Sequence, residues 1–319
     1  MQAKLRIQNG KDIYIPDVVE GITYTTERYG TPSKLTFKVV KDDKLTFEEG
    51  NHVYFGYGGK DLFYGFVFTK QRDKEGVISV TCYDQLRYLK NKDTYVYENK
   101  TASELIKLIA NDFNLKTGDI DDTKFKIASR IEDNQTLFDI IQNALDLTME
   151  NKKEIYVLFD DYGKLALKSL ENMKVNILID AETAENFSYS SSIDDNTYNK
   201  IKLVYDNEET GKRDVYVTQH GENINKWGIL QYYDTLQEGE NGKAKAEALI
   251  QLYNQKTRTL QIKNALGNVN VRAGSLIGVS LNLGDVVLNN YMLVERCKHV
   301  FKMDEHFMDL TVRGGEFVG

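Results

Sequence analysis

The first 88 residues alternate between apolar and polar positions with a period of two. Seven short runs show this alternation, and Gly, Pro, Asn or Asp separates them: AKLRIQ, DIYIPD, GITYTTE, SKLTFKVV, NHVYFGYGG, DLFYGFVFTKQ and GVISVTCYD. This period is typical of strands that bury one face, and turn residues at this spacing indicate a sandwich or a small barrel. Gly58 and Gly59 supply the turn of a hairpin inside FGYGGKDLFYG, because glycine adopts turn dihedral angles that bulky residues resist.

The pattern changes to a helical period between residues 89 and 170. Thr101 and Glu104 form the T-x-x-E arrangement of a capping box, and the apolar residues after them recur at helical spacing. A second helix is predicted in DNQTLFDIIQNALDLTMEN, and EIYVLFDDYGKLALKSL reads as a hairpin that turns at residues 160–163. We therefore predict a compact α/β domain over residues 89–170.

Residues 171–319 return to strand patterns, and we predict a second β-barrel there. A helix in GKAKAEALIQLYNQK interrupts it as a helical excursion around residues 241–256, and the polar stretch from Asp206 to about Gly242 is expected to be mostly loop, with one short strand in DVYVTQHG. Four alternating runs then complete the barrel: RTLQIKN, SLIGVSL, YMLVERCKHVFK and HFMDLTVRG. The predicted fold class is α+β, mostly β, with two β-barrel domains (1–88 and 171–319) and an intervening α/β unit.

The stretch SVTCYDQLRYLKNKDTYVYENKTASELIKLI lies between the first barrel and the α/β unit. It holds a cysteine, several tyrosines and many charges, so it is either a reactive site or a structural joint. The alternation of Ile78, Val80 and Cys82 with polar neighbours favours the joint, because it turns Cys82 inward on a strand. The expected anchors of the joint are Asp84 as the cap of the bend, Leu86 and Leu89 as buried residues, and Thr101 with Glu104 as the start of the next helix.

Composition and charge exclude several classes of function. The chain has 20 Tyr and 14 Phe but only 2 Pro, which favours strands. The net charge is −7 and the 41 basic residues are spread along the sequence, which argues against a protein that neutralises nucleic acid phosphates. No apolar run has the length of a signal peptide or of a membrane helix, so we expect synthesis in the cytoplasm and no membrane contact.

The common patterns of catalytic and metal sites are absent from the sequence. There is no phosphate-binding loop, no H-E-x-x-H and no G-x-S-x-G. Cys82 and Cys297 share no metal-type spacing, so we expect two buried thiols. His299 and His306 are seven residues apart, which places them on opposite faces of one strand, unless a hairpin between them brings them together. We expect no catalytic residue, no metal and no cofactor.

Two other groups of residues are candidates for contacts with partners. Between Val175 and Asn199 the chain has five acidic residues and no basic ones, namely Asp180, Glu182, Glu185, Asp194 and Asp195. Aromatic residues gather in KWGILQYYD, where Trp227, Tyr232 and Tyr233 could form either a subunit contact, in which Tyr and Trp are enriched, or a surface that stacks on sugars.

Three stretches, taken in order, resemble the XkdQ/YqbQ-like phage tail proteins. They are VTCYDQLRYLKNKDTYVYENKTASELIKLIANDF at the joint, FSYSSSIDDNTYNKIKLVYD at the opening of the second barrel, and the tail from AEALIQLYNQKTRTLQIKNALGNVNVRAGSLIGVSL to HFMDLTVRGG. Together they cover most of the chain. One position departs from the family pattern, because Ser275 stands where an Asp is expected.

This resemblance implies a structural baseplate hub of a contractile phage tail or a phage-tail-like bacteriocin, with a fold shared with the hub portion of type VI spike proteins. It implies that both barrels are tail-tube-like and that three chains form a homotrimeric ring of six barrels. The implied partners are the tail tube protein, the central spike protein, a LysM-type baseplate protein and the tape-measure protein, with DNA only as passing cargo.

The implied location is the virion or tail-like particle, assembled in the bacterial cytoplasm. The five acidic residues between Val175 and Asn199 are then candidates for the wall of the lumen, where carboxylates would keep DNA from sticking. A cell-wall hydrolase and a carbohydrate-binding module are the alternatives. Neither a hydrolase constellation nor an added hydrolase domain is recognisable, so wall-cutting activity is expected in another protein.

Overall fold

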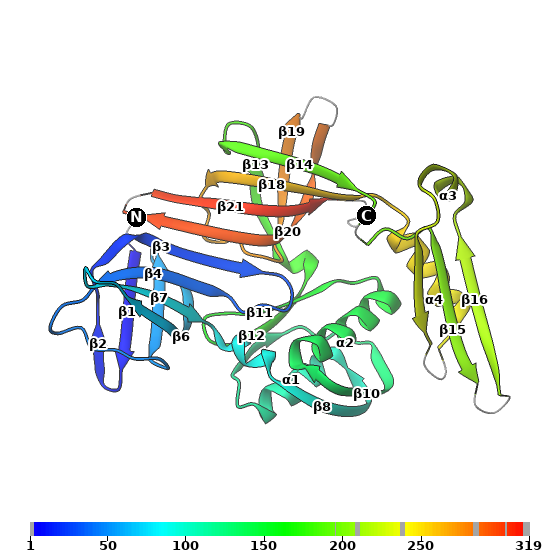
Figure 1. Cartoon of the computed structure of the whole chain (residues 1–319), viewed down its shortest axis with the longest axis horizontal. Coiled ribbons are helices and arrows are strands. Elements are labelled where there is room, and N and C mark those ends of the chain that lie inside the picture. The colour runs from blue at the N-terminus through cyan, green and yellow to red at the C-terminus, as the bar shows by residue number, and fades with distance from the viewer. Residues whose placement is uncertain are drawn as a thin grey trace. The chain divides into compact units, whose positions relative to one another are not determined.

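The structure is a computed structural model that describes residues 3–194, 196–207, 211–236, 240–282, 287–303 and 305–314. The described chain is mostly β, as predicted. It divides into two compact units (Figure 1). The larger unit contains the chain up to Ser188 and again from Leu260 to Gly314, and the smaller unit contains Tyr189–Thr259.

All seven runs predicted in the N-terminal β region are strands. They are β1 (Ala3–Asn9), β2 (Asp12–Tyr14), β3 (Val18–Glu27), β4 (Lys34–Val40), β5 (His52–Tyr57), β6 (Lys60–Arg72) and β7 (Val77–Tyr83). They pair antiparallel in the order β3-β4-β7-β6-β5-β1-β2. Alternate side chains point into one apolar core, for example Leu35, Phe37 and Val39 on β4, and Ile78, Val80 and Cys82 on β7.

The α/β region contains both predicted helices and the predicted hairpin. Its elements are the 3-10 helix η1 (Gln85–Lys90), β8 (Lys92–Thr101), α1 (Ala102–Asp112), β9 (Thr117–Ile120), β10 (Lys126–Thr136), α2 (Leu137–Lys152), β11 (Tyr156–Asp160) and β12 (Leu165–Ser169). β8 pairs with β10, and β11, β12 and β9 form a second small sheet. The apolar faces of both helices bury against these strands in one core.

The C-terminal β region continues the first sheet. It contains the 3-10 helix η2 (Leu170–Met173), β13 (Lys174–Ile179), β14 (Asn186–Ser192), β18 (Thr257–Leu266), β19 (Leu276–Asn282), β20 (Val287–Lys302) and β21 (Glu305–Gly314). The sheet order is β14-β18-β21-β20-β3, so β20 lies beside β3 of the N-terminal region (Figure 1). No closed barrel is found among the described strands, and the two-barrel architecture therefore stays a prediction.

The smaller unit is a three-stranded sheet with a helix on one face. It contains β15 (Lys200–Asn207), β16 (Lys212–Gln219), α3 (Gly221–Trp227), β17 (Gln231–Thr235) and α4 (Gly242–Tyr253). β15 is central, with β16 antiparallel and β17 parallel to it, and α4 buries Ala246 and Leu249 against Ile201 and Leu203. The helix expected around 241–256 is thus α4, which belongs to the smaller unit and packs on its sheet.

The prediction that the segment from Asp206 to Gly242 is mostly loop was wrong. This segment contains all of β16, where one short strand was expected, together with the short helix α3 and β17. β17 has only five residues and pairs with β15 some thirty residues earlier in the chain. The sequence of such a strand shows only a weak apolar–polar pattern. Pairing with distant residues and burial, more than intrinsic preference, determine where strands form.

Candidate functional site: the joint and the exposed surfaces

The bend after β7 connects two separate cores within a few residues. Asp84 caps the 3-10 helix η1, since its Oδ1 accepts a hydrogen bond from Leu86 N at 3.1 Å. Its Oδ2 accepts a second bond from Ser33 N at 3.2 Å. Cys82 lies in the core of the N-terminal β region, whereas Leu86 and Leu89 are buried in the core of the α/β region. Asp84, Leu86 and Leu89 are three of the five expected anchors of this joint; the structure places Asp84 as the cap of η1 and buries both leucines.

The two remaining predicted anchors form the capping box of α1. Thr101 Oγ1 accepts a hydrogen bond from Glu104 N at 3.2 Å, and the Glu104 carboxylate accepts one from Thr101 N at 2.8 Å. The bond from the Thr101 backbone lowers the pKa of Glu104. This reciprocal arrangement satisfies two of the backbone N–H groups that a helix start leaves unpaired.

A buried cluster of charges lies behind the bend and was not predicted. The Asp160 carboxylate accepts hydrogen bonds from Gln85 Nε2 at 2.8 Å and from Gly163 N at 2.7 Å. Burial raises the pKa of Asp160 to about 6, although the Arg272 guanidinium nearby lowers it. Burial, together with the neighbouring charge of Asp160, also raises the pKa of Asp84 well above its usual range. Two buried carboxyl groups therefore lie near one partly buried guanidinium.

Arg272 comes from the loop between β18 and β19 and connects the C-terminal β region to the α/β region. Its Nη1 donates to the backbone carbonyl of Asp160 at 3.2 Å, and its guanidinium lies 4.0 Å from the centre of the Phe159 ring. Ser275 holds the loop, because its Oγ accepts from Arg272 N at 3.1 Å. An Asp at this position could accept the same bond, so the departure from the family pattern leaves the turn intact.

Aromatic rings fill the contact between the N-terminal β region and the α/β region. The ring of Tyr64 on β6 lies 6.1 Å from that of Tyr162, and Phe66 lies 6.0 Å from Tyr88 of η1. Gly163 makes this contact possible, since its φ is +86° and a Cβ atom at this position would lie 2.3 Å from Tyr64 Cδ1. Only glycine combines this backbone conformation with so close an approach.

Strand pairing joins the N-terminal and C-terminal β regions directly. Six consecutive residues of β20, from Arg296 to Phe301, pair with Ile22–Glu27 of β3. Beside this ladder, Arg28 donates to both carboxylate oxygens of Glu295 at 2.7 and 2.9 Å. The bend, the charge cluster, the aromatic contact and this ladder together make the larger unit one connected body.

The hairpin between β20 and β21 brings the two histidines together, which was one of the two predicted outcomes. His299 Nδ1 lies 2.9 Å from His306 Nε2, and His299 Nε2 lies 2.8 Å from the carbonyl oxygen of Val271. Because a carbonyl can only accept, His299 Nε2 carries the proton and His306 donates to His299 Nδ1. Cys82 and Cys297 are free, buried thiols, as predicted, and burial raises the pKa of both.

The acidic candidates are spread over two units. Asp180 closes a turn, since its Oδ1 accepts from Glu182 N and Thr183 N, both at 3.0 Å. Glu185 accepts a hydrogen bond from the Asn264 side chain. Asp194 is exposed and belongs to the smaller unit, while Asp195 lies outside the described residues.

The aromatic candidates do not form one stacking surface. Tyr232 packs among Tyr198 and Tyr253, at ring distances of 5.4 and 5.7 Å. Tyr233 is the next residue on β17, so its side chain lies on the opposite face of the sheet, where it is half exposed. Trp227 is the last residue of α3. A sugar platform that uses all three rings at once is therefore not present.

Among the described residues, no group of His, Cys, Asp and Glu side chains could hold a metal ion. In the same part of the chain, no helix has the length and apolar character needed to cross a membrane.

Comparison with known proteins identifies the class of protein that this fold defines. The structure superposes on the 43 kDa tail protein of prophage MuSo2 from Shewanella oneidensis with a TM-score of 0.70, at 12% sequence identity, over 97% of this chain and 98% of the tail protein. It is also similar to the E. coli c3393 protein, a component of the type VI secretion system with structural similarity to T4 bacteriophage tail proteins gp27 and gp5. That match has a TM-score of 0.59 and 10% identity, and it covers 99% of this chain and 78% of c3393. The fold is that of phage tail proteins.

Sequence comparison then gives the family. A YqbQ-like family model matches residues 22–313. The protein XkdQ of the phage-like element PBSX of Bacillus subtilis (strain 168) is 30% identical over 305 residues, which cover 92% of this chain and 92% of XkdQ. The chain belongs to the YqbQ-like family, as the resemblance of the joint and of the C-terminal strands predicted.

Proposed function

We propose that this protein is the structural hub of a tail baseplate, where a homotrimeric ring joins the tail tube to the central spike. The observation that carries the proposal is the pairing of β20 with β3. It makes the N-terminal and C-terminal β regions parts of one sheet, so a single chain offers two β modules side by side. Three chains would offer six, which matches a sixfold tube on one side to a threefold spike on the other.

The joint supports a role in bearing load. A hub must keep its modules in register while the tail contracts, and a module that swings on a free linker could not do so. Contacts that are buried or partly buried, made by Arg272, Asp160, Gly163 and Tyr64, tie three parts of the larger unit together. Buried polar groups with defined partners favour one arrangement over its alternatives, because an unpaired arrangement is costly.

The partners in this proposal are other proteins of the particle. The tail tube protein, the central spike protein and a LysM-type baseplate protein contact the ring, while the tape-measure protein and, in a phage, DNA pass through its lumen. The particle is a virion or a tail-like bacteriocin. The chain acts as a scaffold and catalyses no reaction, which is supported by its membership of a phage-tail family.

A weaker part of the proposal concerns the lumen. Asp180, Glu182 and Glu185 lie at the connection between β13 and β14, where the side chains of Glu182 and Glu185 are exposed. Carboxylates in the wall of a channel repel a passing polyanion. Trp227 and Tyr233 of the smaller unit are proposed contacts with neighbouring proteins, since aromatic residues are enriched in interfaces.

Co-expression tests the proposal. The chain would be produced together with the tube and spike proteins of the same particle, and the mass of the purified complex would be measured by light scattering. We expect three copies of the chain for each spike trimer. The chain alone can remain monomeric, because association must offset the loss of translational and rotational freedom. A stable complex with another copy number would contradict the trimer.

A second assay separates the hub from a wall hydrolase. The purified chain would be tested by zymography on purified cell wall, next to a known lysozyme. The proposal predicts no clearing by the chain. Clearing by the chain alone would contradict a purely structural role.

A further inference from the structure

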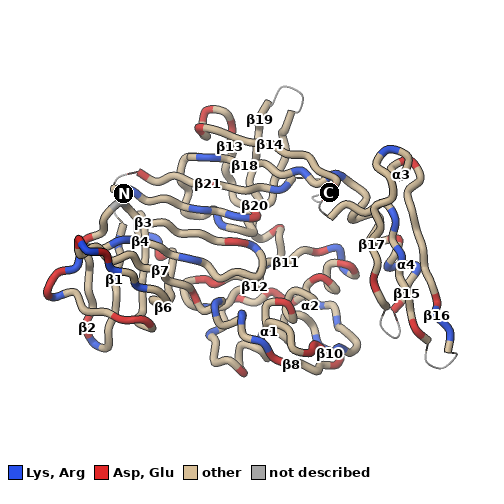
Figure 2. Tube along the Cα trace, viewed as in Figure 1, with Lys and Arg blue, Asp and Glu red and all other residues tan. Residues whose placement is uncertain are grey.

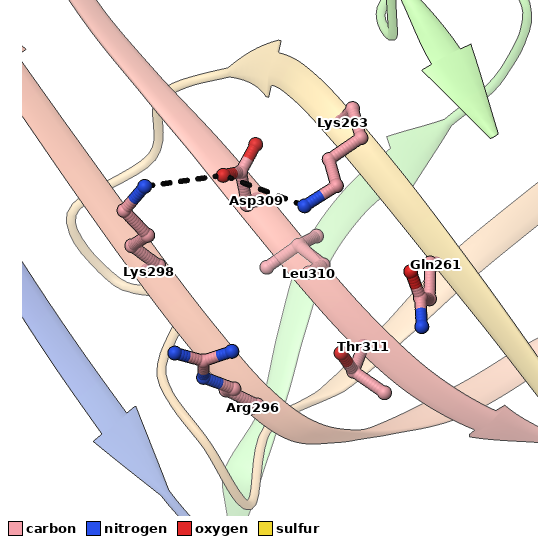
Figure 3. Close-up of a pocket in the computed structure, with 7 residues that line it drawn as sticks. All are labelled: Gln261, Lys263, Arg296, Lys298, Asp309, Leu310 and Thr311. Atoms are coloured by element: carbon pink, nitrogen blue, oxygen red, sulfur yellow. Dashed lines mark ion pairs between the residues drawn. The ribbon is translucent and has the colours of Figure 1, made fainter. Parts of the chain in front are cut away.

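Three cationic side chains gather around a hollow on the exposed face of the sheet formed by β18, β21 and β20. The hollow has a volume of about 230 Å³ (Figure 3). Its lining comprises Gln261, Lys263, Arg296, Lys298, Asp309, Leu310 and Thr311. The cations alternate with inward residues along each strand, since Ile262, Cys297 and His299 are buried on the other face. The register of three strands therefore assembles this lining, although its members are up to 50 positions apart, from Gln261 to Thr311.

The charges in this hollow do not balance. Among the described residues, Asp309 is the only acidic one in the lining, and it lies near two lysines: its Oδ2 is 3.8 Å from Lys263 Nζ and 3.5 Å from Lys298 Nζ. Both distances exceed the usual range for a hydrogen bond. Arg296 lies beside Glu27, with Nε 3.3 Å from Oε1, and more than half of its side chain is exposed. With Glu27 counted, three cations face two carboxylates, which leaves a local charge of +1. Along the rest of the chain, whose net charge is −7, acidic and basic residues are mixed (Figure 2).

The lining is also rich in hydrogen-bond donors. Arg296, Lys263 and Lys298 can only donate, while the Gln261 amide and the Thr311 hydroxyl can donate as well as accept. These donors stand on three different strands, so they approach the hollow from several directions. A tetrahedral phosphate group offers acceptor oxygens in several directions, whereas a carboxylate offers two in one plane. Arginine and lysine are the side chains that proteins use to bind phosphate.

We propose that this hollow binds a phosphate group, supplied either as inorganic phosphate or by the backbone of a nucleic acid. The inference does not depend on the hub function, because it concerns the isolated chain in solution. It also revises what the sequence indicates about charge, since basic residues that are dispersed along the chain meet at one place on the sheet.

The first test is a calorimetric titration of the full chain with inorganic phosphate at low ionic strength. Lys263→Gln with Lys298→Gln should weaken binding at least about tenfold, because about 1.4 kcal/mol of charge-assisted hydrogen bonding corresponds to that factor. Asp309→Asn should strengthen binding several-fold, since it removes the competing carboxylate but keeps an oxygen that can accept from Asn264 N. A general structural lesion would weaken binding in both variants, so opposite signs identify the site.

The matched control is Lys34→Gln with Lys38→Gln, which removes the same charge from β4, a strand of the same sheet. This control should bind phosphate like the wild type. Equal losses of phosphate affinity in the control and in the Lys263/Lys298 variant would overturn the proposal. They would show that phosphate responds to the overall charge of the protein and does not bind at a specific site. Absence of phosphate binding by the wild-type chain would overturn it as well.

The second test separates the two sources of the phosphate. Binding of a short mixed-sequence DNA duplex would be followed by fluorescence anisotropy over a series of salt concentrations. If the hollow takes backbone phosphates, log K falls with log salt, and the Lys263/Lys298 variant reduces the slope by about 2, roughly one unit for each lysine. If the chain binds phosphate but not DNA, the ligand of the hollow is free inorganic phosphate. A polyglutamate peptide that binds more tightly than both would overturn the phosphate assignment in favour of an acidic protein partner.

Discussion

The larger unit contains two groups of acidic and basic side chains that differ in burial. At the joint, Arg272 is packed against Phe159 and lies near the buried carboxyl groups of Asp84 and Asp160. On the sheet face, Lys263 and Lys298 face water around Asp309. When one partner of a buried pair is removed, the remaining charge is left without water or a partner, which lowers the stability of the fold. Removal of one partner of an exposed pair changes the stability little, because water hydrates the remaining charge. Burial therefore makes the first group a structural element and leaves the second free to bind a ligand.

The largest effect is expected from Arg272→Met, which removes the guanidinium and its charge but keeps an unbranched apolar side chain. The variant should lose about 3 kcal/mol of unfolding free energy, because the Asp160 backbone carbonyl loses its donor and the buried Asp160 carboxylate loses its nearby cation. Urea denaturation followed by circular dichroism measures this loss. Arg296→Met is the matched control, since Arg296 is exposed, and it should change stability by less than about 0.5 kcal/mol. Similar losses of unfolding free energy in both variants would show that burial does not distinguish the Arg272 group from the group on the sheet face.

Gly163→Ala tests the aromatic contact at the joint. The added Cβ would lie 2.3 Å from the Tyr64 ring, at a residue whose φ is +86°. Gly76→Ala is the matched control, because Gly76 has a φ of +83° and nothing within 4 Å of its added Cβ. Both variants carry the backbone strain of about 1 kcal/mol, and Gly163→Ala should cost about 1 to 2 kcal/mol more from overpacking. Equal costs in urea denaturation would mean that the Tyr64 contact is loose.

A smaller effect is expected for His299, on the inner face of the strand that carries Arg296 and Lys298, and for His306 on the neighbouring strand β21. Burial lowers the pKa of His299 to about 3 and that of His306 to about 4. Between about pH 6.5 and pH 4 the unfolded chain therefore binds more protons at these groups than the folded chain, and their contribution to stability falls as the pH falls.

The acids of the joint act in the opposite direction in this window. The pKa of Asp160 is raised to about 6, so the folded chain binds more protons at this group, and its contribution rises as the pH falls. The difference between wild type and His306→Gln isolates the contribution of His306. From pH 7 to pH 4 the wild type should lose about 1 kcal/mol more than the variant, after allowance for the partial exposure of His306. Identical pH profiles in urea denaturation would contradict the depressed pKa of His306.

The smallest effect is expected for the double substitution Lys263→Gln and Lys298→Gln. Exposed ion pairs contribute between zero and about 1 kcal/mol, so the unfolding free energy should stay within about 1 kcal/mol of the wild type. The same variant should lose phosphate binding. A large loss of stability would mean that these lysines stabilise the sheet, and that their role is structural like that of Arg272.

Local signals made much of the fold predictable. The period-two runs from AKLRIQ to GVISVTCYD correspond to β1 to β7, because a strand that buries one face shows it in its own residues. The capping box at Thr101 and Glu104 located the start of α1 to the residue. Asp84, Leu86 and Leu89 were predicted as anchors of the joint from their order after an inward-facing strand.

The remaining features depend on contacts between distant residues. Arg272 meets Asp160 across 112 positions, and nothing near either residue signals the other. The hollow around Lys263, Lys298 and Asp309 exists because of strand order and register, which a one-residue shift would abolish. β17 escaped prediction for a related reason, since its parallel partner β15 lies on the other side of β16 and α3.

The most direct test of the hub is electron cryomicroscopy of the intact tail particle. The account predicts three copies of this chain around the tail axis, between tube and spike, with the paired strands β3 and β20 inside each copy. Density for this chain away from the axis, or a number of copies that is not three, would contradict it.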